Sequence, residues 1–314
     1  MALSAPLLTR KKVIKVLAET DKGAYVAPTS AILGFDLEIN PTAPFEERKG
    51  TGLYRGHERA GTLGALSGSC KFKTELRGNG STGMDAGLAI LLQACGLKKT
   101  SESYQVHSTP SADTTISIAV WEDGVLKGLR GAASDLTISG ENGGKVMCDF
   151  DFQGIWQTPS ADALPAYSPG TGAVLKMQGG TFTLDGETIK IAKFNLKLGC
   201  KVVPRYGMKT DAAAVAPGGI AHYMITDYDP VLSIDPEADL VGGYDYFGKW
   251  LSGSEGPVIL ILTNGTTKVT ITLPKVQCRE INEGDRDGIQ IYDYTGQCNH
   301  SSGNDAVTIL AAGA

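Results

Sequence analysis

The sequence predicts a mainly-β (α+β) fold made of two tandem β-sandwich or partial-barrel domains, each with one short α-helix. Three observations predict it. One β-rich unit occurs twice along the chain, apolar and polar residues alternate in many short runs, and glycine supplies 40 of the 314 residues. Glycine between alternating apolar runs is typical of short strands that are joined by tight turns.

The duplicated unit sets the domain organisation. Residues 35–39 resemble residues 194–198, and residues 141–154 align with residues 283–296. A chain of this length has room for two domains, and the Pro-, Ser- and Gly-rich stretch 158–172 is the expected linker. We therefore predict an N-terminal arm over residues 1–30 that docks on a neighbour, a first domain over 31–160 and a second over 161–314.

Each predicted element follows from a local pattern. Alternation of apolar with charged residues predicts strands at 35–39 and 70–76, and a compact apolar segment predicts a helix at 85–95. Three further strands are expected at 116–121, 136–139 and 146–152, with turns at Asp123-Gly124 and Asn142-Gly143. The second domain repeats this order, with a helix at 245–251 and strands at 258–262, 268–273 and 289–294.

Composition disfavours several classes of protein. The net charge is −5 and the basic residues are scattered, so a nucleic-acid reader is disfavoured. The six cysteines have no C-x-x-C spacing, which favours buried, reduced thiols. The basic cluster at 10–12 follows the first apolar run instead of preceding it, and the longest aliphatic run, 258–262, is short. We therefore expect no signal peptide and no membrane helix, and a soluble protein made in the cytoplasm.

Two motifs imitate ligand sites. Residues 78–83 read G-x-G-x-x-G, but the preceding strand alternates with Lys71, Lys73 and Glu75, and no βαβ unit follows. A flexible strand-to-helix turn is favoured over a dinucleotide loop. Residues 283–288 resemble the start of a calcium loop, but Tyr294 stands where the bidentate Glu is required, which favours a polar turn. The four histidines flank no nucleophile or metal signature. We expect no cofactor and no enzymatic activity.

Several segments together resemble a known family. They are residues 7–12 with Glu19-Thr20 behind them, 75–97 (ELRGNGSTGMDAGLAILLQACGL), 123–138 (DGVLKGLRGAASDLTI), 274–277 (PKVQ) and 301–309 (SSGNDAVTI). In this order they resemble the major tail tube protein of long, non-contractile bacteriophage tails (siphoviruses), in the two-domain Mu-like type. Val26 stands after Tyr25 where the family usually has Gly, which is a departure in the N-terminal arm.

The resemblance implies a structural virion protein without catalysis. Trimers would present six pseudo-equivalent domains around a channel, and stacked rings would form the conduit for DNA ejection. The implied partners are further copies of the chain, a tape-measure protein in the lumen, and tail terminator and distal tail proteins at the ends. Double-stranded DNA would pass through without specific binding, and no membrane is involved. The implied location is the virion, after synthesis in the bacterial host cytoplasm.

Two sets of residues are candidates for this role. Open strand edges would pair between subunits and form one inner wall. Alternation places carboxylates on its lumenal face, where they would repel DNA, although an ordinary solvated sheet face explains the pattern equally well. Lys197 matches Glu38 in the repeat, so the wall is not uniformly acidic. The candidates for the wall are Asp36, Glu38, Asp149, Asp151 and Asp293. The loops 41–66 and 204–221 are candidates for contacts with the next ring, through Glu46, Glu47, Arg48, Arg55, Glu58, Arg59, Arg205 and Lys209.

The alternative is a carbohydrate- or receptor-binding β-sandwich, such as a tail or adhesin protein. Exposed aromatic platforms would favour it, but Trp121 and Trp250 fall on predicted core faces, which leaves only Trp156, near the linker. An oxidoreductase built on the glycine string is a more distant third hypothesis.

Overall fold

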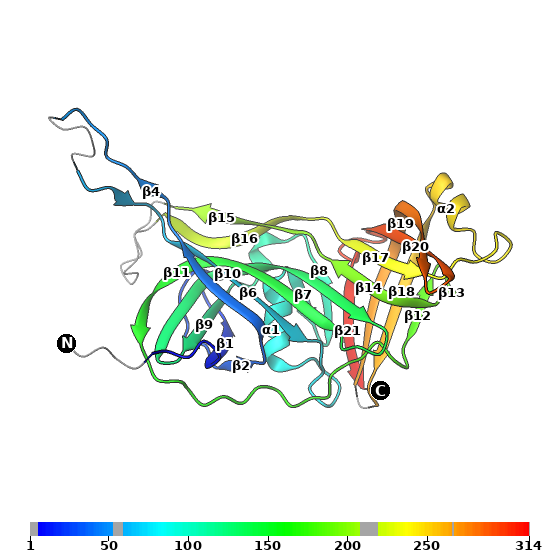
Figure 1. The fold of residues 1–314 in the computed structure, drawn as a ribbon, viewed down its shortest axis with the longest axis horizontal. Helices are drawn as coiled ribbons and strands as arrows, with labels where there is room; N and C mark the ends of the chain where they lie inside the picture. Colours follow the sequence, from blue (N-terminus) through cyan, green and yellow to red (C-terminus); the bar gives the residue numbers. More distant parts are fainter. Residues whose placement is uncertain (1–5, 53–58, 208–218, 266, 314) are drawn as a thin grey trace.

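The computed structural model describes residues 6–52, 59–207, 219–265 and 267–313, and it is mainly β with two short helices (Figure 1). The first half contains β1 (Lys12–Ala18), β2 (Ser30–Ile32), β3 (Phe35–Thr42), β4 (Phe45–Glu46), β5 (Thr62–Leu63), β6 (Ser67–Glu75), α1 (Ala86–Ala94), β7 (Leu97–Thr100), β8 (Ser103–Val106), a 3₁₀ turn (Pro110–Ala112), β9 (Ile116–Glu122), β10 (Val125–Glu141) and β11 (Met147–Ala161). The second half contains β12 (Thr181–Leu184), β13 (Glu187–Thr188), β14 (Ile191–Lys197), β15 (Cys200–Tyr206), β16 (Ile220–Tyr228), β17 (Val231–Pro236), α2 (Tyr246–Ser252), β18 (Glu255–Thr263), β19 (Thr267–Arg286), β20 (Ile289–Asn299) and β21 (Thr308–Gly313).

The two halves share one pattern of antiparallel pairing. In the first half the strand order is β2-β1-β9-β10-β11-β6-β3. In the second it is β13-β12-β18-β19-β20-β17-β14. The C-terminal part of β10 also pairs with β14, so one sheet runs through both halves. Among the described strands the pairings branch but do not close into a barrel.

The predicted helices and turns are confirmed. Asp85 caps α1 by accepting from the backbone N–H groups of Gly87 and Leu88, and Asp245 caps α2 by accepting from that of Gly248. The expected turn at Asp123-Gly124 joins β9 to β10, with positive φ at both residues, and the segment between β10 and β11 contains Asn142-Gly143. The strands β10, β11 and β19 are longer than predicted, because each continues past a break in the apolar alternation.

Two segments at the predicted boundaries form parts of the sheet of the first half. Residues 12–18 were expected in an arm that docks on a neighbour, but they form β1, which lies between β9 and β2 with Val16 fully buried. Residues 158–161 were expected in the linker, but they end β11, where Ala161 pairs with Val125. Apolar residues at 13, 14 and 16 find a complementary sheet edge within the first half, which outweighs the polar surroundings of the segment.

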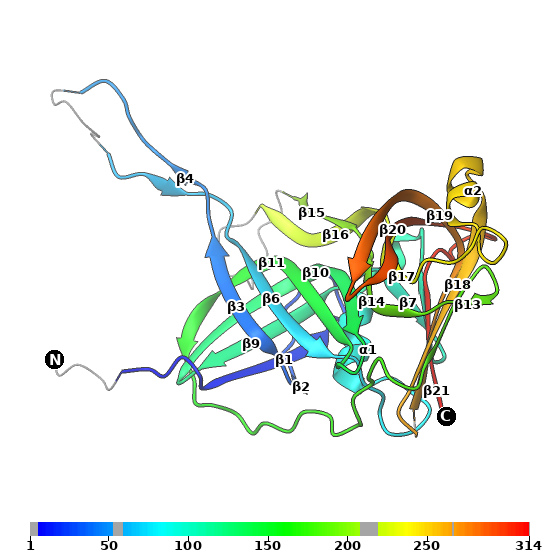
Figure 2. The same ribbon diagram turned by 45° about the vertical axis from the view of Figure 1, so that its right-hand side comes forward.

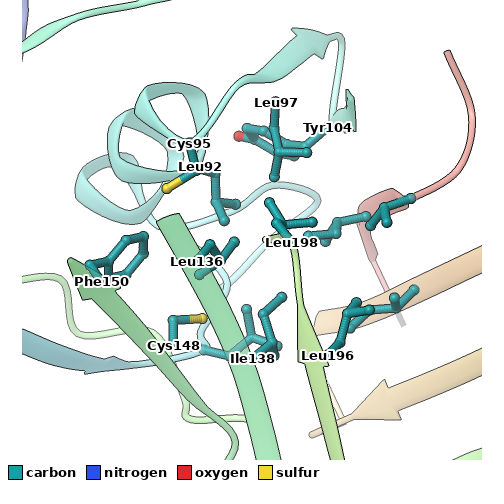
Figure 3. Packing of buried hydrophobic residues seen from close by; sticks show 14 of the residues in the cluster. Leu92, Cys95, Leu97, Tyr104, Leu136, Ile138, Cys148, Phe150, Leu196 and Leu198 are labelled. Carbon is teal, nitrogen blue, oxygen red and sulfur yellow. The ribbon is translucent and has the colours of Figure 1, made fainter. Parts of the chain in front are cut away.

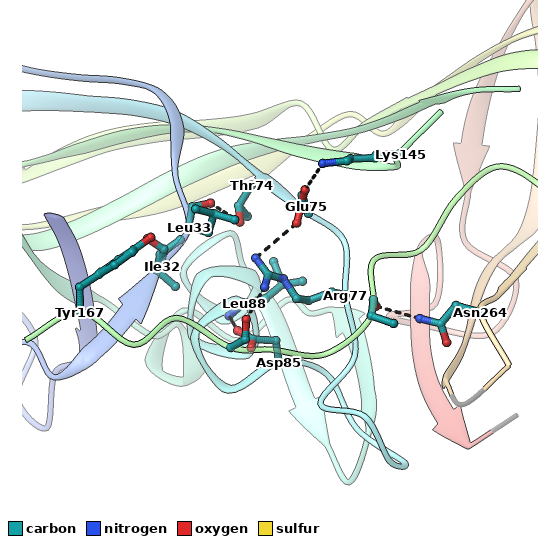
Figure 4. A network of polar contacts seen from close by, with 12 residues as sticks. Ile32, Leu33, Thr74, Glu75, Arg77, Asp85, Leu88, Lys145, Tyr167 and Asn264 are labelled. Carbon is teal, nitrogen blue, oxygen red and sulfur yellow. Dashed lines mark hydrogen bonds and ion pairs between the residues drawn. The ribbon is translucent and has the colours of Figure 1, made fainter. Parts of the chain in front are cut away.

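The segment after β11 runs back along the first half as a strap (Figure 4). Tyr167 donates to the carbonyl of Ile32 at 3.2 Å, and the Arg77 guanidinium donates to the carbonyl of Gly170. Arg77 is also ion-paired with buried Glu75 at 3.5 Å, and Lys145 lies 2.5 Å from the same carboxylate. These bonds satisfy buried charges and hold the strap in place.

One continuous apolar core lies under the sheet and extends through the junction of the two halves. Leu196 and Leu198 of the β14 region pack beside Leu136 and Ile138 of β10 (Figure 3). In the first half, the ring of Phe150 packs against those of Phe72 and Phe152, at centroid distances of 5.6 and 5.8 Å. The predicted buried, unpaired cysteines are confirmed at positions 70, 95, 148 and 298, whereas Cys200 and Cys278 are half-buried.

Candidate assembly surface

The face of the sheet opposite the core is polar and continuous across both halves. Backbone register places Glu38, Lys71, Asp151 and Asp135 side by side across β3, β6, β11 and β10. A second row crosses the junction through Ser139, Asn195, Ser233, Thr295 and Glu280, on β10, β14, β17, β20 and β19. We call this surface, built on eight neighbouring strands from β3 to β19, the polar face.

The polar face carries lysines as well as the predicted carboxylates. Lys71 Nζ lies 2.9 Å from Asp151 Oδ2, and Lys73 Nζ lies 3.7 Å from Asp36 Oδ2. In the second half Lys193 lies 3.9 Å from Asp293. The hydrogen bond to Asp151 raises the pKa of Lys71, whereas burial raises the pKa of the Asp149 carboxyl. The face is therefore a mosaic of opposite charges.

The five predicted wall residues are brought together only in part. Glu38, Asp149, Asp151 and Asp293 follow the alternation that places them on the polar face. Asp36 stands at a bulge of β3 with φ of 53°, outside the regular alternation, but its carboxylate still lies 3.7 Å from Lys73 Nζ on the polar face. Sequence reasoning missed the contribution of Asp135, Lys193 and the β6 lysines. The alternation at 71 and 73 was visible, but a single strand does not reveal which face its partner presents.

Two edges of the eight-strand sheet have no described strand beside them. At one end, β3 pairs with β6 on one side only. At the other end, the C-terminal part of β19 pairs with β20 on one side only, because β18 and β21 pair with its N-terminal part. Unpaired backbone groups along such edges readily accept another strand.

The two long loops take different positions in the single chain. The hairpin β15–β16 packs against the first half, where Tyr223 is buried with Ala133 and Ile155. The hairpin β4–β5 instead projects from the body (Figure 2). It exposes Phe45 and Leu63, which pair across the two strands with 62% and 60% of their surface accessible.

The predicted ring-stacking residues divide between these hairpins. Glu46, Glu47, Arg48 and Arg59 are exposed along the projecting segment. Arg205 lies in β15, exposed and paired in register with His222. Arg55, Glu58 and Lys209 lie outside the described residues.

Two of the three tryptophans differ from the expectation. Trp156 is buried, at 6% exposure, and Trp121 is buried as predicted. Trp250, predicted on a core face, is 40% exposed on α2, next to Leu251 at 78%. The short helix buries only Tyr246 fully, so its apolar C-terminal end faces outward.

The two ligand-like motifs form turns. In the glycine string, the Asn79 side chain accepts from the backbone N–H groups of Ser81 and Gly83 at 2.8 and 3.2 Å. In the calcium-like segment, the Asp285 carboxylate accepts from the N–H of Gly288, and β19 turns directly into β20. The Asn79 carboxamide and the Asp285 carboxylate therefore each hydrogen-bond to the backbone of the turn that contains them.

Neither described helix is long and apolar enough to span a bilayer. A scan against protein-family models finds no match to the chain, and neither does a search of curated proteins.

Proposed function

We propose that the chain is a structural subunit of a long, non-contractile phage tail, which assembles as trimeric rings that stack into a hollow tube. One observation carries the proposal: a single polar face extends over eight strands of both halves and ends at an open edge on each side. A sheet of this kind buries its edges by pairing with further copies, and repetition of one head-to-tail joint closes a ring.

The dimensions of such a ring suit a conduit. Three copies would supply a barrel of about 24 strands, and strands spaced ~4.8 Å apart give a perimeter of ~115 Å, or a diameter of ~37 Å. Strand tilt widens this diameter, and side chains narrow it. The resulting bore admits a DNA duplex or an extended tape-measure protein.

The charges of the polar face suit transit without binding. A row of free lysines would hold phosphates through counter-ion release. Here the lysines of β6 stand beside Asp36 and Asp151, and Lys193 stands beside Asp293. Each lysine is therefore partly neutralised by the wall itself, and DNA would slide along it. Tail terminator and distal tail proteins would complete the two ends of the tube in the virion.

A carbohydrate- or receptor-binding module is the second candidate, because Trp250 is exposed. Aromatic side chains provide stacking platforms for sugars. Leu251, next to it in the chain, and Leu240 and Val241, in the segment before α2, are also exposed and apolar, however, which is more typical of a protein interface than of a sugar site.

Electron microscopy of the purified chain tests the proposal. We expect rings with threefold symmetry and two similar lobes per subunit, which stack at high protein concentration. Dispersed monomers over a wide concentration range, combined with binding to a glycan array that is lost in Trp250→Ala, would favour the second candidate instead.

A further inference from the structure

The residues of the two halves can be matched through the register of their paired strands. Phe152 in β11 and Tyr294 in β20 occupy the same place in the aligned motifs at 150–154 and 292–296. Phe152 pairs with Ser134 of β10, and Tyr294 pairs with Ile281 of β19. Ser134 and Ile281 are therefore counterparts, meaning that they hold the same position in the two sheets.

The other side of each sheet extends the correspondence. Phe152 also pairs with Cys70, which in turn pairs with Ile39 of β3. Tyr294 also pairs with Ile234, which pairs with Phe194 of β14. The counterpart of Phe194 is thus Ile39, and not Phe35 as the sequence repeat suggests. Strands β3 and β14 are counterparts, and so are β10 and β19.

This correspondence shows that the chain already contains one joint between a β10-type and a β14-type strand. Within the chain, Thr137 pairs with Lys197, Ile138 with Leu196, and the N–H of Leu198 donates to the carbonyl of Leu136 at 2.9 Å. The counterparts of these two strands are the open edge of β19 and the open edge of β3.

We propose that the β10–β14 joint is the template for the contact between two copies of this chain, with β19 of one copy pairing antiparallel with β3 of the next. The register follows by counting three residues along each strand from the counterparts. Thr137 maps to Gly284 and Lys197 maps to Thr42, so Gly284 faces Thr42 of the next copy. Asp285 then faces Pro41. This inference rests on the proposed function, because it specifies the joint by which the ring closes.

The inter-copy joint differs from its template at one donor. Leu196 presents its N–H toward β10, because it lies two residues before Leu198, whose N–H bonds to Leu136 just beyond the end of β14. Its counterpart is Pro41, which has no N–H. Proline on an edge strand weakens indiscriminate pairing. The inter-copy joint therefore has one hydrogen bond fewer than the joint within the chain.

The hairpins extend the same template. At the base of β15–β16, Cys200 pairs with Tyr228, and the Cys200 thiol donates to the carbonyl of Cys95 at the C-terminal end of α1. The β4–β5 hairpin follows β3 at the same distance, with Phe45 in the place of Cys200. Its target on the next copy is the C-terminal end of α2.

That target carries the exposed apolar surface that the hairpin needs. Helix α2 lies beside β19, where Trp250 Nε1 donates to the carbonyl of Arg279 and Gln277 Nε2 to that of Gly253. Trp250 and Leu251 are exposed at this end. Phe45 and Leu63 of one copy would cover them in the next. The β4–β5 hairpin is thereby assigned to the joint within a ring, and not to the contact between stacked rings.

Disulfide cross-linking tests the register. The pair 42/284 corresponds to a non-hydrogen-bonded pair, with Cα atoms about 4.5 Å apart, which suits a disulfide. The double variant Thr42→Cys, Gly284→Cys is oxidised and run on a non-reducing gel, with the wild-type chain as background for its own cysteines. We expect covalent dimers and trimers. The matched control Thr42→Cys, Asn282→Cys is displaced by two residues and should give far less product.

The internal joint supplies a positive control on the same gel. Thr137→Cys, Lys197→Cys is the template pair and should form an intrachain disulfide, seen as a faster monomer band. If Gly284→Cys prevents folding, Ala43→Cys with Glu283→Cys tests the same register at two other positions.

The outcomes separate the register from the function. Rings in the microscope whose chains cross-link through position 282 in preference to 284, or through neither, would overturn the register and leave the tube intact. Absence of rings together with absence of inter-copy products, while the internal control cross-links, would overturn both.

Discussion

Removing the Phe45 side chain should weaken assembly and leave the fold of the single chain intact. Phe45 is 62% exposed on the projecting hairpin, and complete burial of such a side chain contributes about 1.5–3 kcal/mol. Covering the exposed portion therefore stabilises each joint by about 1–2 kcal/mol, which corresponds to a roughly 5–30-fold change in its dissociation constant. Phe45→Ser should raise the protein concentration needed for ring formation by about this factor.

The assay has two parts and a matched control. Sedimentation velocity over a concentration series gives the assembly constant, and thermal unfolding of dilute chain gives stability. Phe45→Ser should weaken the assembly constant and leave the thermal stability of the dilute chain unchanged. Tyr223→Ala, in the hairpin that packs within the chain, should instead lower the free energy of unfolding by about 3 kcal/mol. Equal assembly constants for Phe45→Ser and wild type would refute the docking of the hairpin on a neighbour.

Three further predictions concern the edge, the core and the response to acid. Pro41→Leu restores a backbone donor on the open edge and should strengthen assembly by about 1 kcal/mol per joint, measured by the same concentration series; weaker assembly would contradict the register. Phe150→Ala removes a fully buried ring and should cost about 3–5 kcal/mol in denaturant unfolding, whereas a loss below about 1 kcal/mol would contradict the packing. Burial favours the neutral form of Glu122, but hydrogen bonds from Lys12 and Lys127 outweigh burial and lower the pKa of the Glu122 carboxyl. The contribution of Glu122 to stability is therefore present above its unfolded pKa. It is lost as pH falls through the lower pKa of the folded state. Wild-type stability should therefore decline over that acidic range more than that of Glu122→Gln, and identical pH profiles would contradict this assignment.

Local structure was largely predictable from the sequence, because its causes are local. Asp85 and Asp245 cap helices as acids at such positions do, and the turn at Asp123-Gly124 forms where positive φ is required. The lengths of the strands were harder to predict from the sequence. In β10 the alternation is interrupted at the bulge near Gly131, which has φ of 57°, so the sequence pattern recovers only the part after the bulge.

For the candidate site, the sequence predicts only which residues share a face of the same strand. Alternation shows that Asp149 and Asp151 share one side of a strand, but it does not name the neighbouring strand. The pairing of Asp151 with Lys71 is therefore invisible until register is known. Trp250 was misplaced for a related reason, because a helix of seven residues leaves one end beyond the sheet that would bury it.

The strand β21 pairs with β19 in the second half and with β8 in the first, where Ile309 stands opposite Ile271 and Tyr104. In chain order it comes after every other described strand. A nascent polypeptide on the ribosome therefore cannot complete the seam between its two halves until these residues have emerged. Under the proposed assembly, this order of synthesis would delay polymerisation until the whole chain is made and so keep incomplete subunits out of a growing tube.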